Sequence, residues 1–172
     1  MIISLSEILI KQQQLDKYIY DHNNVGIEDV KQELLLATIV ELAEFANEVR
    51  SFKFWSKRGM NSKEDILEEY VDGIHFISSF ANYYRIDPIF NLSNIRIILD
   101  KRVITNEFNK LFYLLTKINY LKPNDYNAKL IKKYIKQYIL LGLGLGIKFD
   151  EIKEAYDKKY EINIKRQDSG TY

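Results

Sequence analysis

The segment IEDVKQELLLATIVELAEFANEVR, residues 27–50, carries the clearest helical pattern in the chain. Its apolar residues recur every three to four positions, as they do along one face of an α-helix. The face expected to point inward consists of Val30, Leu34, Ala37, Ile39, Leu42 and Phe45. We therefore predict a long helix over 27–50. The aromatic and basic segment that follows, residues 51–59, breaks this periodicity and is predicted to be a loop.

The same spacing continues on both sides of this helix. The predicted helices cover residues up to about 21, 27–50, 62–85, 104–119, 126–141 and 150–167, with a turn at 122–125. Residues suited to capping a helix precede three of them: Ser4 or Ser6, Ser62 and Asp150. The glycines of LGLGLGI, residues 141–147, lack the spacing of a dinucleotide-binding loop and are predicted to allow close packing at a helix end. The sequence thus predicts an all-α fold, a bundle of about five or six helices in one domain spanning 1–172.

The composition excludes several classes of chemistry. The chain has 172 residues, 47% of them hydrophobic, and 0 Cys, which rules out disulfides, zinc–thiolate sites, iron–sulfur clusters and cysteine nucleophiles. A formal net charge of +1 provides no overall attraction to nucleic acid or to an anionic membrane. The N-terminal residues show no signal-peptide pattern, and no apolar run is long enough to span a bilayer. We therefore expect a cytoplasmic protein without a nucleic-acid or membrane partner.

The strongest functional signal is acidic. Glu41, Glu44 and Glu48 share one face of the second predicted helix, and Glu69 and Asp72 share a face of the third. If the two helices are antiparallel, these carboxylates meet, and like charges at such short range require a cation. Oxygen ligands favour Mg²⁺ or Mn²⁺. Solvated outer faces are the alternative interpretation, but apolar neighbours and the absence of Lys or Arg over 34–46 favour a metal site.

Three further groups of residues could contribute to a site. Lys159, Asn163 and Arg166 share one face of the last predicted helix and could hold phosphate oxygens, although a charged terminal helix can also be a solvated surface. Trp55 could form the wall of a pocket for a planar base, or belong to the core. His75 follows Asp72 by three residues and could contact a ligand or be a buried structural histidine.

Four segments together resemble a known family. They are residues 40–56 (VELAEFANEVRSFKFWS), 68–79 (EEYVDGIHFISS), 155–172 (AYDKKYEINIKRQDSGTY) and, more faintly, 12–16 (QQQLD). In this order they resemble the dimeric, all-α dUTP diphosphatases, relatives of the MazG-type nucleotide pyrophosphohydrolases. The resemblance implies the all-α NTP pyrophosphatase fold, a homodimer, and hydrolysis of dUTP, and also of dUDP, which limits uracil incorporation into DNA.

The resemblance also implies roles for individual residues. The Mg²⁺ ligands would be Glu41, Glu44, Glu69 and Asp72, with Glu48 as an outer or additional ligand. These would hold two or three Mg²⁺ ions, for which Mn²⁺ can substitute, and Glu41 or Glu44 would activate the attacking water. The phosphate-contacting residues would be Lys159, Asn163 and Arg166. The nucleoside pocket would involve Gln13, Asp16, Trp55, His75 and Phe76. An amide often stands at the position of Asp16, so this chain departs from the family pattern there.

Three other functions are compatible with parts of this pattern. A MazG-like pyrophosphohydrolase acting on another nucleotide, such as dCTP or a damaged nucleotide, would share the four acids. A helical di-iron protein would use Asp72 and His75, but that class needs a Glu-x-x-His pair on each of two helices, and only one Asp-x-x-His is present here. A helical interaction module without catalytic activity is the third alternative.

Overall fold

A computed structural model describes residues 1–93, 95–118 and 125–170. Over these residues the chain forms six helices and one two-stranded sheet, which confirms the predicted all-α fold. In chain order the elements are β1 (Ile2–Ser4), α1 (Ser6–Asn23), α2 (Ile27–Val49), α3 (Lys63–Tyr83), β2 (Ile89–Asn91), α4 (Lys101–Lys117), α5 (Asp125–Gly144) and α6 (Phe149–Ser169). None of the described helices is both long enough and apolar enough to cross a bilayer.

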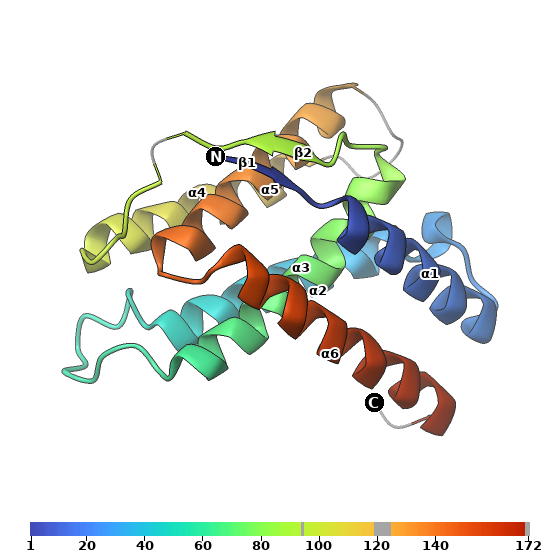
Figure 1. Cartoon of the computed structure of the whole chain (residues 1–172), viewed down its shortest axis with the longest axis horizontal. Helices are drawn as coiled ribbons and strands as arrows, with labels where there is room; N and C mark the ends of the chain where they lie inside the picture. The colour runs from blue at the N-terminus through green and yellow to red at the C-terminus, as the bar shows by residue number, and fades with distance from the viewer. Residues whose placement is uncertain (94, 119–124, 171–172) are drawn as a thin grey trace.

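Helix α3 is the centre of the arrangement. It contacts α1, α2, α5 and α6, whereas α4 packs against α2 and α5 (Figure 1). More than half of its residues are buried, and they occupy several of its faces. A helix that is apolar on most faces must be covered on most sides, which explains its central position. Residues of α3 therefore face four neighbouring helices at once.

Two glycines allow α3 and α5 to approach closely. The rings of Tyr70 and Tyr138 stack with centroids 4.7 Å apart, and the Tyr138 hydroxyl donates a 2.9 Å hydrogen bond to the main-chain oxygen of Tyr70. A Cβ atom on Gly73 would lie 2.2 Å from the Tyr138 hydroxyl oxygen, and one on Gly142 would lie 2.5 Å from Cζ of Tyr70. The prediction that the glycine run permits close packing is confirmed for Gly142.

Helix α2 has one buried and one exposed apolar face. Leu42 and Phe45 are buried as predicted, but Val30, Leu34, Ala37 and Ile39 are only half-buried. Leu36 and Val40, one turn apart, are 62% and 43% exposed. Helix α2 carries enough apolar side chains to pack against two surfaces, and the described part of this chain packs against only one of its faces.

The small sheet was not predicted from the sequence. β1 pairs with β2 in antiparallel orientation, with Ile3 opposite Phe90, and both side chains are buried. Three-residue strands are too short to show the alternation by which a strand is recognised. The sheet ties the start of the chain to the segment after α3.

The helix starts test the predicted caps. Ser62 caps α3, because its hydroxyl oxygen accepts a hydrogen bond from the Asp65 main-chain N–H. The caps predicted at Ser4 or Ser6 and at Asp150 are wrong. Leu5 precedes α1 without a side-chain cap, and α6 begins after Lys148, whose main-chain N–H donates to the Glu151 carboxylate.

The remaining boundaries differ from the predictions by a few residues. α4 begins at Lys101, three residues before the predicted start, because Asp100 accepts a hydrogen bond from the Arg102 main-chain N–H. α5 extends to Gly144, into the glycine run, instead of ending at residue 141. Most of the turn predicted at 122–125, and residue 119 at the predicted end of the fourth helix, lie outside the described residues.

Candidate active site

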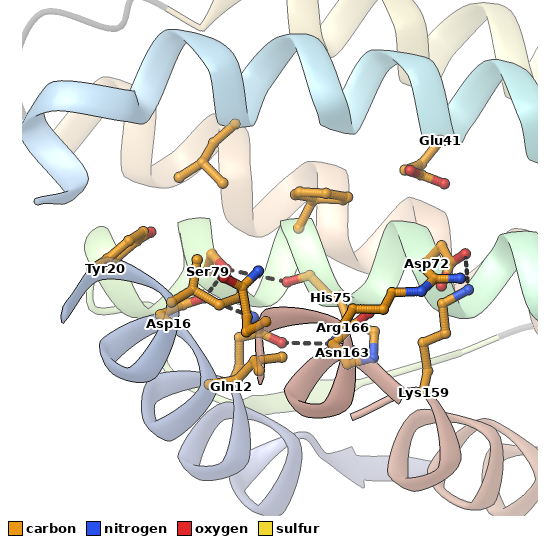
Figure 2. A pocket seen from close by; sticks show the side chains of 15 residues that line it. Gln12, Asp16, Tyr20, Glu41, Asp72, His75, Ser79, Lys159, Asn163 and Arg166 are labelled. Carbon is orange, nitrogen blue, oxygen red and sulfur yellow. Dashed lines mark hydrogen bonds and ion pairs between the residues drawn. The ribbon is translucent and has the colours of Figure 1, made fainter. Parts of the chain in front are cut away.

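A cavity of about 430 Å³ lies among α1, α2, α3 and α6. Its two ends differ in chemistry (Figure 2). At one end Glu41 and Asp72 lie near Lys159, and at the other Asp16 and Tyr20 lie near Ser79. We call these the acidic end and the α1 end. The four helices that form the cavity are the ones that carry the sequence motifs.

The acidic end contains three carboxylates from two helices. One carboxylate oxygen of each of Glu41, Glu69 and Asp72 lies within 4.8 Å of the others, and all three residues are half-buried. Glu41 comes from α2, whereas Glu69 and Asp72 share a face of α3. The two helices pack against each other after the loop 50–62 reverses the chain. The structure thus brings together acids from the two predicted pairs.

The electrostatics of this end favour a bound cation. Burial, followed by the charges of Asp72, Glu44 and Glu69, raises the pKa of Glu41 to about 7. Burial and neighbouring carboxylates likewise raise the pKa of Glu69 to about 7, and burial raises that of Asp72. One oxygen of Glu41, Oε2, is buried and has no hydrogen-bond partner among the described residues. Such an oxygen gains most from a positive ion placed beside it.

Lys159 provides part of the compensating charge. Its ammonium lies 2.6 Å from Asp72 Oδ2 and 3.5 Å from Glu68 Oε1, and its side chain is only 12% exposed. Burial alone would lower the pKa of Lys159, but the hydrogen bond to Asp72 and the charges of Asp72 and Glu68 raise it. A single ammonium therefore faces several acids, which leaves the cluster with an excess of negative charge.

Glu44 and Glu48 occupy different positions from the other predicted ligands. Glu44 is exposed and its oxygens lie outside the described group, although its charge contributes to the raised pKa values of Glu41 and Glu69. The Glu48 carboxylate accepts a hydrogen bond from the Asn61 amide, and the Glu48 main-chain oxygen accepts one from Asn61 N–H at 3.0 Å. Glu48 thereby holds the loop between α2 and α3 in place.

The predicted phosphate-binding residues lie along the cavity on α6. Lys159, Asn163 and Arg166 all line it, with Asn163 half-buried and Arg166 exposed (Figure 2). The charge of Arg166 is among the influences that lower the pKa of Asp72. Two cationic side chains and an amide are thus available next to the acidic end.

A hydrogen-bonded network, which we call the Gln12 network, joins α1, α3 and α6 beside the cavity. Gln12 is its centre. Its amide nitrogen donates to Asp16 Oδ1 at 2.7 Å and to Ser79 Oγ at 3.1 Å. Its amide oxygen lies 2.9 Å from His75 Nδ1 and accepts a 2.7 Å hydrogen bond from the Tyr156 hydroxyl. All four hydrogen-bonding positions of a buried amide are therefore used.

His75 belongs to this network. It is 5% exposed, and its ring stacks on Tyr156 with centroids 4.1 Å apart. Burial, followed by the charge of Lys159, lowers the pKa of His75 to about 3, so the ring is neutral at physiological pH. His75 and its neighbour Phe76 both line the cavity.

The sequence model of the dUTPase family matches residues 4–171, which is nearly the whole chain. The chain belongs to the all-α dUTPase family. Its activity is that of a dUTP diphosphatase, a nucleotide pyrophosphohydrolase. No curated protein matches this chain. dUTPases use divalent metal ions, and the group of Glu41, Glu69 and Asp72 is the place in the described part of the chain suited to such an ion.

The structure places two predicted site residues of this dUTPase outside the cavity. Gln13 is exposed, and Gln12 lines the cavity in its place, because a shift of one residue rotates a helical side chain by about 100°. Trp55 lies outside this cavity and is 66% exposed. α2 ends at Val49, and the loop carries Trp55 away from the cavity, where it packs against Phe52 and Phe54.

Sequence reasoning missed Tyr20 and Ser79, which line the cavity, and Tyr156, which donates a hydrogen bond to Gln12. A pattern that points to two of them is present. Gln12, Asp16 and Tyr20 recur at i, i+4 and i+8 on α1, so they share one face. On α3, Ser79 follows His75 by four residues in the same way. This helical spacing of polar residues on α1 and α3 would have indicated Tyr20 and Ser79.

Proposed function

We propose that this dUTPase hydrolyses dUTP to dUMP and pyrophosphate with the help of Mg²⁺, and that it accepts dUDP as well. The observation that carries the proposal is the convergence of Glu41, Glu69 and Asp72, with oxygens within 4.8 Å of one another, at one end of a cavity large enough for a nucleoside. Hydrolysis of dUTP keeps uracil out of DNA. The protein would do this in the cytoplasm, as a single domain spanning 1–172.

The donor set at the acidic end fits Mg²⁺. All of its ligand atoms are carboxylate oxygens, and the buried Glu41 Oε2 has no other described partner. We assign Glu41, Glu69 and Asp72 as ligands, with Glu44 completing the set and Glu48 next to it, for two or three Mg²⁺ ions or Mn²⁺ in their place. When bound, such ions neutralise the triphosphate and make the attacking water more acidic.

Glu41 is the best placed general base. Without a bound ion, burial and the neighbouring acids raise its pKa to about 7. Of the pair from which the base was expected, Glu44 is exposed and Glu41 is half-buried inside the cavity. In this proposal Glu41 accepts the proton of the water that attacks the triphosphate, and Glu44 adds negative charge that maintains the basicity of Glu41.

Lys159, Asn163 and Arg166 would contact the phosphates. Lys159 is engaged by Asp72 and Glu68 in this structure. Compensation of their negative charge by a cation frees its ammonium for a phosphate oxygen. Arg166 offers a planar guanidinium that can hold two phosphate oxygens at once, and its positive charge stabilises the leaving pyrophosphate.

The rest of the cavity would hold the nucleoside. Seven residues separate Asp72 from Ser79 on α3, a distance of roughly 10 Å along the helix axis. With the phosphates next to Asp72, the sugar lies next to His75 and Phe76 and the base near Asp16. The Phe76 ring would form the apolar wall that disfavours a 2′-hydroxyl, and Gln12 rather than Gln13 would hold the polar wall in position.

A second copy of the chain would complete the enzyme as a homodimer. The exposed Leu36 and Val40 on α2 favour this arrangement, since apolar side chains one turn apart form a surface suited to a partner helix. Light scattering on the purified protein should give twice the mass of one chain. Val40→Lys should shift the protein toward the monomer, whereas a purely monomeric wild type would refute the dimer.

The direct test is pyrophosphate release from a panel of nucleoside triphosphates with and without Mg²⁺. We expect rapid release from dUTP, little from dTTP and UTP, and none after removal of the metal. Preferential hydrolysis of dCTP would instead indicate a related pyrophosphohydrolase of different specificity. Glu33→Gln is a suitable control, because Glu33 is an exposed acid on the same helix as Glu41 and lies outside the cavity.

A further inference from the structure

Tyr20 has a hydroxyl group that the protein itself does not use. Its side chain lines the cavity at the α1 end, next to Asp16 and Ser79 (Figure 2). The hydroxyl oxygen is buried and has no hydrogen-bond partner among the described residues. The buried hydroxyl of Tyr156, by contrast, donates a hydrogen bond to Gln12. A buried hydroxyl without a partner in a cavity is suited to a ligand atom.

Asp16 supplies the complementary group. Its Oδ1 accepts hydrogen bonds from Gln12 and Ser79, which leaves Oδ2 without a described donor. Burial, followed by the charge of Asp16, raises the pKa of Tyr20, so the phenol keeps its proton at physiological pH. The α1 end thus presents one hydrogen-bond donor, the Tyr20 hydroxyl, next to one acceptor, the Asp16 carboxylate.

Uracil fits this pair. Its ring carries carbonyl oxygens on either side of an imide N–H, so an acceptor and a donor alternate along its edge. Leu15, Ile19 and Leu34 line the same cavity and offer apolar surface to the faces of a planar ring. We infer that Tyr20 is a base-binding residue whose hydroxyl donates a hydrogen bond to a carbonyl oxygen of uracil while Asp16 accepts the imide N–H. This inference rests on the proposed placement of the phosphates at the acidic end.

Removal of the Tyr20 hydroxyl should not destabilise the protein. A buried hydroxyl without a partner destabilises the folded protein relative to a hydrogen atom, so Tyr20→Phe should melt at the same temperature as the wild type or higher. Tyr138→Phe, which removes the hydrogen bond to the Tyr70 main-chain oxygen, should melt lower. A structural role for the Tyr20 hydroxyl would instead give Tyr20→Phe a lower melting temperature, and that result would overturn the inference.

Affinity for dUMP, measured by calorimetry without divalent ions, tests the contact itself. Loss of one neutral hydrogen bond should weaken dUMP binding to Tyr20→Phe about tenfold. Tyr18→Phe is the matched control, because Tyr18 lies two residues away, is bonded to the exposed Asp168, and does not line the cavity. It should bind dUMP as the wild type does. Equal affinity of Tyr20→Phe and wild type for dUMP would refute the contact.

Thio-substituted nucleotides identify the oxygen. 2-Thio-dUMP and 4-thio-dUMP each replace one ring carbonyl oxygen by sulfur, a weaker acceptor. On the analogue that lacks the contacted oxygen, wild type and Tyr20→Phe should bind equally, whereas on the other the tenfold difference should persist. A difference that persists on both analogues would overturn the inference. Because these measurements use neither metal nor turnover, their failure is distinguishable from a failure of the metal site.

Discussion

The two ends of the cavity hold polar side chains in opposite ways. At the acidic end, Glu41, Glu69 and Asp72 repel one another, and Lys159 compensates only part of their charge. In the Gln12 network, the Gln12 amide forms hydrogen bonds with four side chains without any ligand: those of Asp16, His75, Ser79 and Tyr156. The first arrangement is unfavourable until a cation binds, whereas the second stabilises the free protein. Removing the Glu41 charge and removing the Gln12 amide should therefore affect stability in opposite directions.

The largest expected effect lies at the acidic end. Asp72→Asn and Glu41→Gln should each lower dUTP turnover by about 10³-fold or more, because each removes a negative ligand atom that a neutral amide replaces poorly. The melting temperature of Glu41→Gln should stay equal or rise, since this substitution removes repulsion, whereas Asp72→Asn also breaks the ion pair with Lys159 and should melt lower than Glu41→Gln. Steady-state kinetics and thermal unfolding check this, with Glu33→Gln as the control. Turnover close to that of the wild type would show that these residues are not metal ligands.

Arg166 tests how far the acidic end extends along α6. Arg166→Ala should lower kcat for dUTP by roughly 10- to 100-fold, because a cation that stabilises the leaving phosphates is lost. Affinity for dUMP, which lacks those phosphates, should change less than twofold. Lys165 is an exposed cation on the same helix outside the cavity, so Lys165→Ala is the matched control. An equal loss of kcat in both variants would show that Arg166 acts only as a surface charge.

Substitution of Gln12 tests whether the Gln12 network stabilises the free protein. Gln12→Leu leaves the buried His75 Nδ1 and Tyr156 hydroxyl without their Gln12 partner and should lower the free energy of unfolding by about 2–3 kcal/mol. Gln13→Leu, one residue along and exposed, should change it by less than about 0.5 kcal/mol. Urea denaturation of both variants measures the difference. Equal stabilities would show that the network contributes nothing to the fold.

The pH dependence of stability provides the smallest but most general comparison. The pKa values of Glu41 and Glu69 are raised to about 7 and that of Asp16 to about 6, all above their ordinary values. The native state therefore binds these protons more tightly than the unfolded chain, and stability increases as the pH falls through these values.

Without metal, the protein should melt higher at about pH 6.5 than at about pH 8, whereas below about pH 6.5 the lowered pKa of His75 opposes the trend. Mg²⁺ should raise the melting temperature more at the higher pH, where the carboxylates are ionised and do not exchange protons for the ion. Differential scanning calorimetry checks both trends. The double variant Glu41→Gln with Glu69→Gln should flatten the dependence. An unchanged slope in that variant would show that other groups cause it.

The predicted site residues that the structure brings together lie on long periodic helices. The spacing of Glu41 on α2 and of Glu69 and Asp72 on α3 fixes which way each side chain points, and the loop 50–62 makes the two helices antiparallel. The meeting of the acids follows from those two facts. Ser62 could be recognised as a cap for a similar reason, since its interaction with Asp65 is local.

The structure departs from the expected positions where the local sequence pattern carries no information. Three consecutive glutamines, residues 12–14, are equivalent in composition, and only the packing of α1 selects Gln12. Trp55 lies on a loop whose path no periodicity determines. Asp150 is as good a cap in isolation as any residue, but the chain already enters α6 after Lys148, where Glu151 accepts the main-chain N–H. Tertiary packing decided each of these positions.

Electron paramagnetic resonance of Mn²⁺ most directly tests whether carboxylates from α2 and α3 share a divalent ion. Titration of the wild type and Glu33→Gln should show saturable Mn²⁺ binding that Mg²⁺ displaces. Glu41→Gln, on α2, and Asp72→Asn, on α3, should each weaken this binding at least about tenfold, because a shared site needs ligands from both helices. Wild-type affinity for Mn²⁺ in either of those two variants would contradict a shared metal site.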